Sequence, residues 1–551
     1  MICLSVYYGL KVFSSALVLW NLLLFVEALE TTRDIKVEKV QVSVNGDRSI
    51  ATVSENFICA TLDWWPPEKC DYGTCSWGHS SLLNLDLRNS ILQNAVKGLS
   101  PLLLRLGGSL QDQVIYNVGN IQRPCGTFFS AAGLFGFSEG CINMSRWQDL
   151  NEFFYLTGSQ VAFGLNALYG REQDTSLRWD SSNTQSFIQY TADNLYPVYA
   201  WELGNELSSS GVGASLSISQ YAADIKELRI IIDRIYAGWT EKPLVVAPDG
   251  FFEKSWYAQF LQETGTQVLD ACTHHIYNLG PGISTNVLDT RILDPDVLNN
   301  VVGTFDQLQQ TIQTHGPWAQ AWVGESGGAY NSGQHLVSDA FLSSFWYVDQ
   351  LGMAACFNTQ VYCRQSLVGG NYGLLNRTTF QPNPDYYSAF LWKELVGTQV
   401  LATNVIATPK LRAYAHCSKG DTLAVTVVLI NLSNGTAYSI DLSLSNSSAS
   451  YGPVQSAAIR IDFLTDIFTR KARKTFEIQN KRFEYHLTAP NGNLHSQKVL
   501  LNGKTLEITA DGNIPDLVPI LADSSKPIQV APTSIVFVKI PNVYTPACNI
   551  I

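Results

Sequence analysis

The 551-residue chain predicts an α/β fold, a (β/α)8 TIM barrel with a C-terminal β-sandwich. Short apolar strands alternate with helix-period segments over residues 51–395, which is typical of a barrel of parallel strands. Over residues 396–551, β-rich runs and turn signals such as Asn434-Gly435 replace that alternation. A chain of this length also exceeds one ordinary core. A doubly wound sheet is the alternative, but no glycine-rich dinucleotide loop follows the first strand.

The N-terminal 50 residues are predicted to lie outside the barrel. Lys11 precedes an apolar run over residues 12–26, and Val26-Glu27-Ala28 offers a cleavage site, so residues 1–28 predict a signal peptide. A membrane anchor is the alternative, but it needs roughly 20 apolar residues. Residues 29–50 have strand character, and we expect this strand to join the sandwich.

Candidate strands and one clear helix organise the barrel region. Six apolar runs are read as strands: 102–106, 161–165, 196–203, 244–247, 271–275 and 321–324. Apolar residues recur at helical spacing between Ser219 and Tyr236: Ile225, Leu228, Ile232 and Ile235. We expect Ser219 to cap this helix, and Asp224 to lie on another face with the charged residues around it.

Two glutamates each follow an apolar run, where a barrel carries its chemistry. Glu206 ends Trp201-Glu202-Leu203-Gly204-Asn205-Glu206, and Glu325 follows 119 residues later. A retaining glycosidase needs two carboxyl groups about 5–5.5 Å apart. We expect Glu206, with a raised pKa, to be the proton donor and acceptor, and Glu325 to be the nucleophile. Asn205 would hydrogen-bond the sugar 2-hydroxyl.

Two other functions are weighed against the glycosidase. Gly324-Glu325-Ser326-Gly327-Gly328 matches the G-x-S-x-G elbow of serine hydrolases. In that hypothesis Ser326 attacks, with Asp339 and either His416 or His486 as partners. However, a glycine-rich stretch delays the next helix. The other alternative is a non-catalytic glycan-binding wall protein with a disabled site.

The run His274-His275-Ile276-Tyr277 ends another strand. A zinc site lacks the HExxH or cysteine partners that it needs, and histidines satisfied within the core are the plainer interpretation. In a barrel, His275 and Tyr277 would lie near the nucleophile, and the tyrosine hydroxyl would orient Glu325. We expect no metal and no other cofactor.

Composition and charge restrict the partners. The net charge of −11 argues against nucleic acid or an anionic membrane as the main partner. The basic run over residues 470–474 is interpreted as a solvated loop. No segment after the signal is long and apolar enough to be an integral membrane span, and the oligomeric state is left open.

Cysteines and glycosylation sequons fit a secreted protein. Of 11 cysteines, Cys3 would leave with the signal. Three pairings are guessed, because sequence alone does not fix connectivity: Cys70/Cys75, Cys125/Cys141 and Cys417/Cys548. N-glycosylation sequons occur five times: at Asn143, Asn376, Asn431, Asn434 and Asn446.

Several motifs carry a family resemblance along nearly the whole mature chain: Leu104-Arg105-Leu106-Gly107-Gly108, residues 163–168, residues 201–206, residues 274–277, Gly324-Glu325, Arg364-Gln365, residues 369–372 and Pro384-Asp385-Tyr386. With these motifs the chain resembles the heparanase and β-glucuronidase family of retaining glycosidases, glycoside hydrolase family 79. The plant heparanase-like and baicalin β-glucuronidase members are most similar.

The resemblance implies the same fold and the same roles for Glu206 and Glu325. It also implies that the backbone N–H of Gly370 and the phenol of Tyr372 bind the carboxylate of a uronic acid, and that Arg105 supports the nucleophile. The same sugar subsite would be lined by five further residues: Asp63, Asn205, His275, Tyr277 and Tyr330.

The chain departs from animal heparanase, in which a long linker is excised. The corresponding region, residues 116–148, is short and contains Cys125 and Cys141, so two-subunit processing is not expected. Basic clusters are sparse near the proposed cleft. The expected substrate is therefore a glucuronate-containing glycan such as arabinogalactan, or a small glucuronide, rather than heparan sulfate. The expected location is extracellular or the cell wall, or else the vacuole or lysosome, with peripheral membrane association. Residues 470–482 resemble an insertion.

Overall fold

The computed structural model describes residues 35–119, 121, 124–282, 287–406, 408–445 and 480–549. The predicted signal peptide, the Asn446 sequon and the basic run over residues 470–474 lie outside the described residues. Within the described ranges, no helix is both long enough and apolar enough to cross a membrane.

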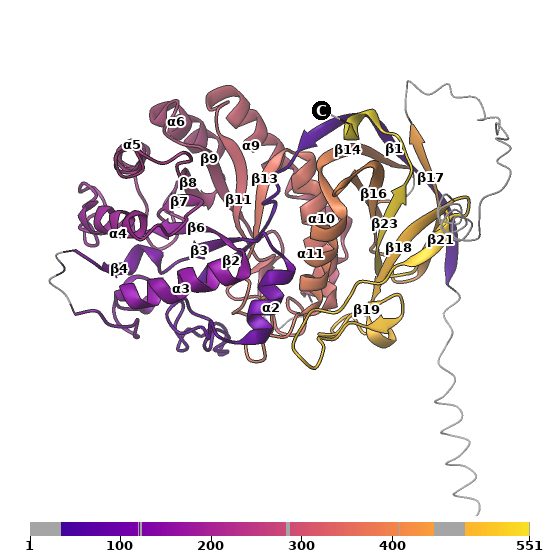
Figure 1. The fold of residues 1–551 in the computed structure, drawn as a ribbon, viewed down its shortest axis with the longest axis horizontal. Helices are drawn as coiled ribbons and strands as arrows, with labels where there is room; N and C mark the ends of the chain where they lie inside the picture. The colour runs from indigo at the N-terminus through magenta and orange to yellow at the C-terminus, as the bar shows by residue number, and fades with distance from the viewer. Residues whose placement is uncertain are drawn as a thin grey trace, which may run out of the picture.

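Eight parallel strands close into a barrel in the spatial order β11-β13-β2-β3-β6-β7-β8-β9 (Figure 1). Their bounds are β2 (Ile58–Asp63), β3 (Leu103–Gly107), β6 (Gln160–Leu165), β7 (Ala200–Leu203), β8 (Leu244–Phe251), β9 (Ala271–Ile276), β11 (Gln320–Ser326) and β13 (Thr359–Arg364). The predicted (β/α)8 barrel is confirmed, since helices follow these strands around the outside.

Ten helices surround the barrel in the described part of the chain. Their bounds are α2 (Ser90–Gly98), α3 (Met144–Thr157), α4 (Ser182–Asp193), α5 (Ile218–Ile235), α6 (Lys254–Thr264), α7 (Val287–Ile292), α8 (Pro295–Asn299), α9 (Val302–His315), α10 (Phe341–Cys356) and α11 (Pro384–Leu395). Short strands decorate the loops: β4 (Val114–Asn117), β5 (Gly140–Asn143), β10 (Gly280–Pro281) and β12 (Ala329–Tyr330).

Helix α5 corrects two details of the sequence interpretation. Its cap is Ser217, whose hydroxyl accepts from the Gln220 backbone N–H at 3.3 Å, so Ser219 lies inside the helix. Asp224 is buried and pairs with Arg171 at 2.6 Å. A charged residue within the helical pattern therefore faces the core, because another element supplies its partner.

Strands β2 and β13 were not among the six strands predicted from apolar runs. They are adjacent in the barrel, and a disulfide between Cys59 and Cys363 joins them. Three other disulfides join Cys70 to Cys75, Cys125 to Cys141 and Cys417 to Cys548. Cys272 and Cys356 form no disulfide with any cysteine that the structure describes.

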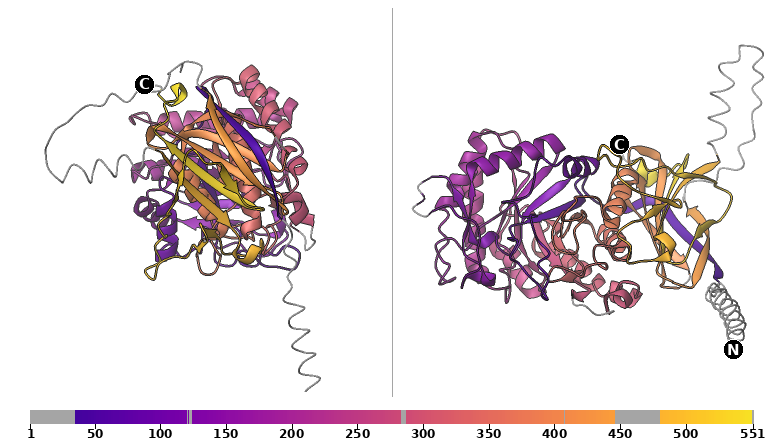
Figure 2. Two further views of the ribbon diagram at one scale, coloured as in Figure 1. Left: turned by 90° about the vertical axis from the view of Figure 1, so that its right-hand side faces the viewer. Right: turned by 90° about the horizontal axis from the view of Figure 1, so that it is seen from below.

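The C-terminal domain is one coiled, mixed sheet that also contains the first strand, as the sequence predicted (Figure 2). Its strands are β1 (Lys36–Thr52), β14 (Val396–Ile406), β15 (Leu411–Ser418), β16 (Asp421–Asn431), β17 (Thr436–Ser445), β18 (Lys481–Thr488), β19 (Leu500–Leu501), β20 (Lys504–Thr505), β21 (Ile520–Asp523), β22 (Ile528–Val530) and β23 (Ser534–Pro541). Strand β1 is antiparallel to β14 and parallel to β17.

The two faces of this sheet follow the strand period of two. In β16, Val425, Val427 and Leu429 point into a core internal to the sheet. Val428 and Ile430 point the other way, into the core that the sheet shares with the barrel. Helices α10 and α11 lie between the sheet and the barrel strands, so the barrel is supported on one side (Figure 1).

The sequons fall in different environments. Asn143 and Asn434 are exposed, and Asn376 is partly exposed. Asn431 is fully buried, and its amide donates to the carbonyls of Thr436 and Ala531, both at 2.8 Å. The prediction of a glycan at Asn431 is therefore wrong, because the folded chain uses that amide inside the sheet.

Candidate active site

Glu206 is fixed by a turn directly after β7. Its backbone has a φ of 55°, in the left-handed region that residues other than glycine rarely occupy. Its N–H donates to the Asp249 carbonyl at 2.7 Å, and its own carbonyl accepts from Val212 at 2.8 Å. The strained conformation is thus held from β8 and from the following loop, and it aims the carboxyl group across the barrel mouth.

Glu206 and Glu325 lie together at the carboxyl end of the barrel. A carboxylate oxygen of each and a ring nitrogen of His275 all lie within 4.8 Å of one another. The two glutamates are 8% and 7% exposed, so both are nearly enclosed yet open to the cavity. This spacing suits direct attack by one carboxylate, since an inverting pair stands about 6.5–9.5 Å apart.

Donors surround the Glu325 carboxylate. Arg105 donates from Nη1 to Oε2 at 2.7 Å, reaching from β3, and the Tyr277 hydroxyl donates to Oε1 at 2.5 Å. Both oxygens are therefore held in place. Donors to both oxygens fix the orientation of the carboxylate that would attack as the nucleophile.

Glu206 has the opposite environment. Burial raises its pKa, and the neighbouring negative charge of Glu325 adds to the rise. His275 opposes this, because its Nδ1–H donates to Glu206 Oε1 at 2.8 Å. The net pKa is still raised, which suits a group that must give up and take back a proton.

Behind this pair lies a buried charge cluster that the sequence did not indicate. Asp249 forms ion pairs with Arg105 and, at 2.9 Å, with Nε2 of His275. Burial alone would raise the pKa of Asp249, but these two cations lower it to about 2. Burial alone would lower the pKa of His275, but Asp249 and Glu325 raise it well above its usual value.

The raised pKa of His275 favours a protonated ring, whose two nitrogens face Glu206 and Asp249. Glu202 completes the cluster, accepting from Arg105 Nε at 3.0 Å. Glu206, His275 and Glu325 are residue types that bind metals. However, both ring nitrogens already face carboxylates, and both Glu325 oxygens already accept hydrogen bonds, so the donor set fits a proton-transfer site better than a metal site.

Asn205 is buried and held on two sides. Its Oδ1 accepts from Arg105 at 2.8 Å, and its backbone N–H donates to Asp112 at 2.8 Å. Its Nδ2 has no partner among the described residues. The predicted contact with a sugar 2-hydroxyl is therefore not shown, because this Nδ2 is buried and Asn205 does not line the cavity.

The glutamates open into a cavity of about 350 Å³. Its lining includes six residues of the predicted site: Asp63, Glu206, Tyr277, Glu325, Tyr330 and Tyr372. Four other predicted residues, Arg105, Asn205, His275 and Gly370, are not in the lining and lie behind it. A Cβ at Gly370 would lie 2.6 Å from the Tyr372 ring, so glycine is what lets this ring approach the backbone.

Asp63 and Gln365 occupy one wall of the cavity. Gln365 donates to Asp63 Oδ2 at 3.0 Å and to the Tyr372 hydroxyl at 3.4 Å. Burial, assisted by the charge of Glu325, raises the pKa of Asp63 to about 8, and its Oδ1 has no partner in the described chain. Gln365 carried no predicted role, although it belongs to a recognised motif.

The rim of the cavity is tied together by side chains. Trp77 donates to the Ser332 hydroxyl at 2.9 Å, and this hydroxyl donates to Asp71 at 2.5 Å. Asp71 lies in the small loop closed by the Cys70–Cys75 disulfide. The loop closed by this disulfide is therefore hydrogen-bonded, through Asp71, to Ser332 in the segment that follows Glu325, and both residues line the cavity.

The structure does not assemble the serine hydrolase triad. Ser326 is fully buried, and its hydroxyl bonds the Tyr362 hydroxyl at 2.8 Å rather than a histidine. Asp339 contacts His335, and His416 bonds the Gly397 carbonyl in the C-terminal sheet. The G-x-S-x-G match is therefore an accident of the turn after β11.

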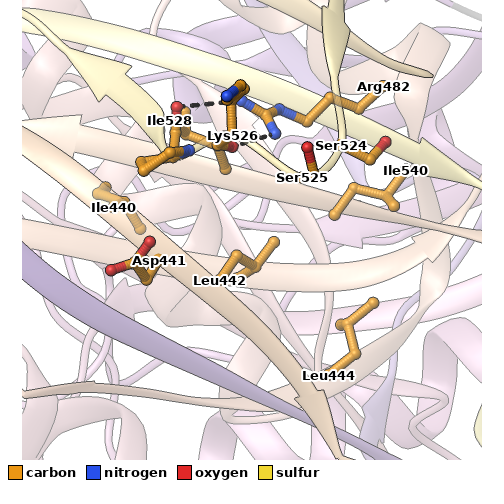
Figure 3. A pocket seen from close by; sticks show the side chains of 11 residues that line it. Ile440, Asp441, Leu442, Leu444, Arg482, Ser524, Ser525, Lys526, Ile528 and Ile540 are labelled. Atoms are coloured by element: carbon orange, nitrogen blue, oxygen red, sulfur yellow. Dashed lines mark hydrogen bonds between the residues drawn. The ribbon is translucent and has the colours of Figure 1, made fainter. Parts of the chain in front are cut away.

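A second cavity, of about 240 Å³, lies in the C-terminal sheet (Figure 3). Ile440, Leu442 and Leu444 supply apolar lining, and Arg482 contributes the largest polar side chain. Arg482 is already committed, since it donates to Glu484 and to the Lys526 carbonyl, both at 2.6 Å. Its lining offers no pair of carboxyl groups, so the cleavage chemistry belongs to the barrel.

The charge on His275 predicts a pH effect. In His275→Gln the amide still donates to Glu206, but the cation that lowers the pKa of Glu206 is gone. A higher pKa of Glu206 keeps this acid protonated to higher pH, so the alkaline limb of the kcat/KM profile should move to higher pH. His315→Gln, at the end of α9, is the control and should leave the profile in place; a downward shift of the limb in His275→Gln would contradict this account.

Comparisons with known proteins identify the family of the chain. Residues 39–352 match the family described as glycosyl hydrolase family 79, N-terminal domain. Heparanase-like protein 1 of Arabidopsis thaliana is 48% identical, covering 94% of this chain and 96% of the relative. Baicalin-beta-D-glucuronidase of Scutellaria baicalensis is 38% identical, covering 93% of both.

Among solved structures, a 4-O-alpha-L-rhamnosyl-beta-D-glucuronidase from Fusarium oxysporum 12S has a TM-score of 0.61 at 14% identity, covering 90% of this chain and all of that one. A likeness at this identity speaks for the fold alone. The family match over residues 39–352 and the 48% identity to heparanase-like protein 1 over 94% of the chain show more than the fold. The chain belongs to glycosyl hydrolase family 79.

Proposed function

We propose that this glycoside hydrolase is a secreted retaining β-glucuronidase with Glu206 as acid/base and Glu325 as nucleophile. One observation carries the proposal: two carboxyl groups within 4.8 Å, one held by an arginine and a tyrosine and the other raised in pKa by burial. When two neighbouring carboxyl groups have such different environments, one can serve as the proton donor and the other as the nucleophile.

The geometry supports a two-step displacement. Glu325 attacks the anomeric carbon while Glu206 gives its proton to the leaving oxygen, and a glucuronyl ester forms on Glu325. Glu206 then takes a proton from water, whose oxygen attacks the same carbon and releases Glu325. His275 stabilises the Glu206 anion between the two steps, because its Nδ1–H points at that carboxylate.

Glucuronate is supported by the wall opposite Glu206. Tyr372 and the partly protonated Asp63 present hydroxyl donors there, and Gly370 lies directly behind the tyrosine ring. Such neutral donors can hold a carboxylate without a buried cation. Relatives named for glucuronide cleavage support the same sugar. We propose terminal glucuronate on cell-wall glycans such as arabinogalactan, or on small glucuronides, as the substrate.

A panel of aryl glycosides tests the sugar. We expect the β-glucuronide to exceed the β-glucoside by at least about 100-fold in kcat/KM, since a site built to bond a polar group rejects the analogue without it. Tyr372→Phe should reduce the glucuronide-to-glucoside ratio of kcat/KM about tenfold, because it removes one hydrogen bond to a charged group. Tyr155→Phe, an exposed tyrosine on α3, is the control. Equal rates on the two sugars would remove the glucuronate assignment.

A further inference from the structure

We propose that the leaving-group side of the cavity is an apolar subsite that selects an aromatic ring, so that aryl and arylalkyl β-glucuronides are the preferred substrates over charged glycan acceptors. This rests on the proposed function and deepens it. The cavity has two unlike walls, and only one of them carries the groups that suit a uronic acid.

The barrel order places these walls opposite each other. Asp63 ends β2 and Gln365 follows β13, which are neighbouring strands. Glu206 follows β7 and Phe251 ends β8, three or four strands away around a closed ring of eight. The proton donor must face the departing oxygen, so the leaving group lies toward the β7 and β8 side.

That side is apolar and accessible. Phe251 is 44% exposed and Val212 is 36% exposed, although both line the cavity. Both residues contact the groups that handle the proton. Val212 donates its N–H to the Glu206 carbonyl at 2.8 Å. The Phe251 ring lies edge-on to His275, with 6.2 Å between the ring centroids. Exposed apolar groups fixed beside a proton donor favour an apolar leaving group.

Phe135 continues this apolar surface. It lines the same cavity and packs edge-on against Trp65 at 6.0 Å between centroids. Gly213, next to Val212, lies so close to Phe135 that a Cβ there would be 2.9 Å from its ring. The loop after β7 and the segment around Phe135 therefore form one surface, on which an aromatic ring can pack edge-on or offset.

The charges of the cavity exclude the other class of acceptor. Among its lining residues, Lys69 is the one cation, and it is already committed. It pairs with Asp71 at 3.0 Å and lies 4.5 Å over the Trp65 ring. A sulfated or uronate-bearing acceptor would therefore lie against Val212 and Phe251 with no free cation to pair with its negative charge. Removing that charge from water without a partner would cost free energy.

Two substrates isolate the subsite from the chemistry. Methyl and benzyl β-D-glucuronide have leaving alcohols of nearly equal acidity, so a difference between them reports packing of the ring. We expect kcat/KM for the benzyl compound to be about tenfold higher, and Phe251→Ala to reduce that ratio about tenfold. Tyr155→Ala, which removes an exposed ring on α3, should leave the ratio as it is.

The second half-reaction gives an independent measurement on the unaltered protein. An alcohol oxygen attacks the anomeric carbon of the Glu325 ester, the bond to Glu325 breaks, and Glu206 takes the alcohol proton. Benzyl alcohol should compete with water more effectively than methanol at equal concentration, giving more benzyl glucuronide. If kcat/KM is nearly equal for the benzyl and methyl glucuronides, and both alcohols trap the ester equally, the apolar subsite is wrong but the glucuronidase assignment stands. If neither glucuronide is cleaved, both the subsite and the glucuronidase assignment are wrong.

Discussion

Glu325→Gln is expected to abolish turnover of an aryl β-glucuronide, with kcat lowered by at least about 10³-fold. The amide cannot attack the anomeric carbon, and it no longer provides the negative charge that Arg105 and Tyr277 hold in place. Steady-state release of the phenol measures the loss, and a thermal melt shows whether the fold is intact.

A substitution to a smaller side chain distinguishes loss of the nucleophile from misfolding of the protein. Glu325→Ala opens space beside Arg105, so azide should enter and restore cleavage, forming the α-glucuronyl azide by a single displacement. Ser326→Ala is the matched control, since within the described ranges the Ser326 hydroxyl bonds only the Tyr362 hydroxyl. Full activity of Glu325→Gln in a folded protein would show that another group attacks.

Glu206→Gln is expected to have an effect that depends on the leaving group. An alcohol needs the proton, so kcat/KM for an alkyl glucuronide should fall by about 10²–10⁴-fold. A dinitrophenol leaves without a proton, so its first step should survive and the ester on Glu325 should accumulate. Rapid mixing would reveal a burst of phenol followed by slow turnover, whereas equal losses on both substrates would contradict the role of Glu206.

The pH profile of the unaltered protein follows from the same group. Burial raises the pKa of Glu206, so its acid form persists to higher pH than that of an exposed glutamate. Activity should therefore decline on the alkaline side as Glu206 loses its proton, and Glu206→Gln should remove that limb for an activated substrate.

Strand prediction worked where a strand is an uninterrupted apolar run. Residues 161–165 of β6 and residues 244–247 of β8 are of this kind, because helices cover their outer faces. β2 and β13 end in Thr61-Leu62-Asp63 and Cys363-Arg364, and these polar residues obscured the pattern. Arg364 is tolerated in the interior because Asp385, on α11, pairs with it at 2.9 Å. Sequence spacing contains no sign of that partner.

The same limit explains the active site. Glu206 and Glu325 could be named because each ends a strand within a recognisable motif. Asp249 could not, since its role comes from contacts with Arg105 and His275, which belong to two other strands. The partners of a buried charge are set by barrel closure, so a single sequence reveals the reacting groups more readily than the groups that tune them.

The pairing of β1 with β17 has a consequence for synthesis of the chain. Lys36 pairs with Thr436 and Asn45 with Ser445, each 400 residues later. At roughly 5–20 residues per second, roughly 20–80 s of translation separate the two strands. Through that interval β1 has an unsatisfied backbone edge, open to non-native partners. Ribosome-bound chains that end between Ile406 and Thr436 therefore carry the complete barrel sequence and β14, but β1 still lacks its β17 partner along one edge.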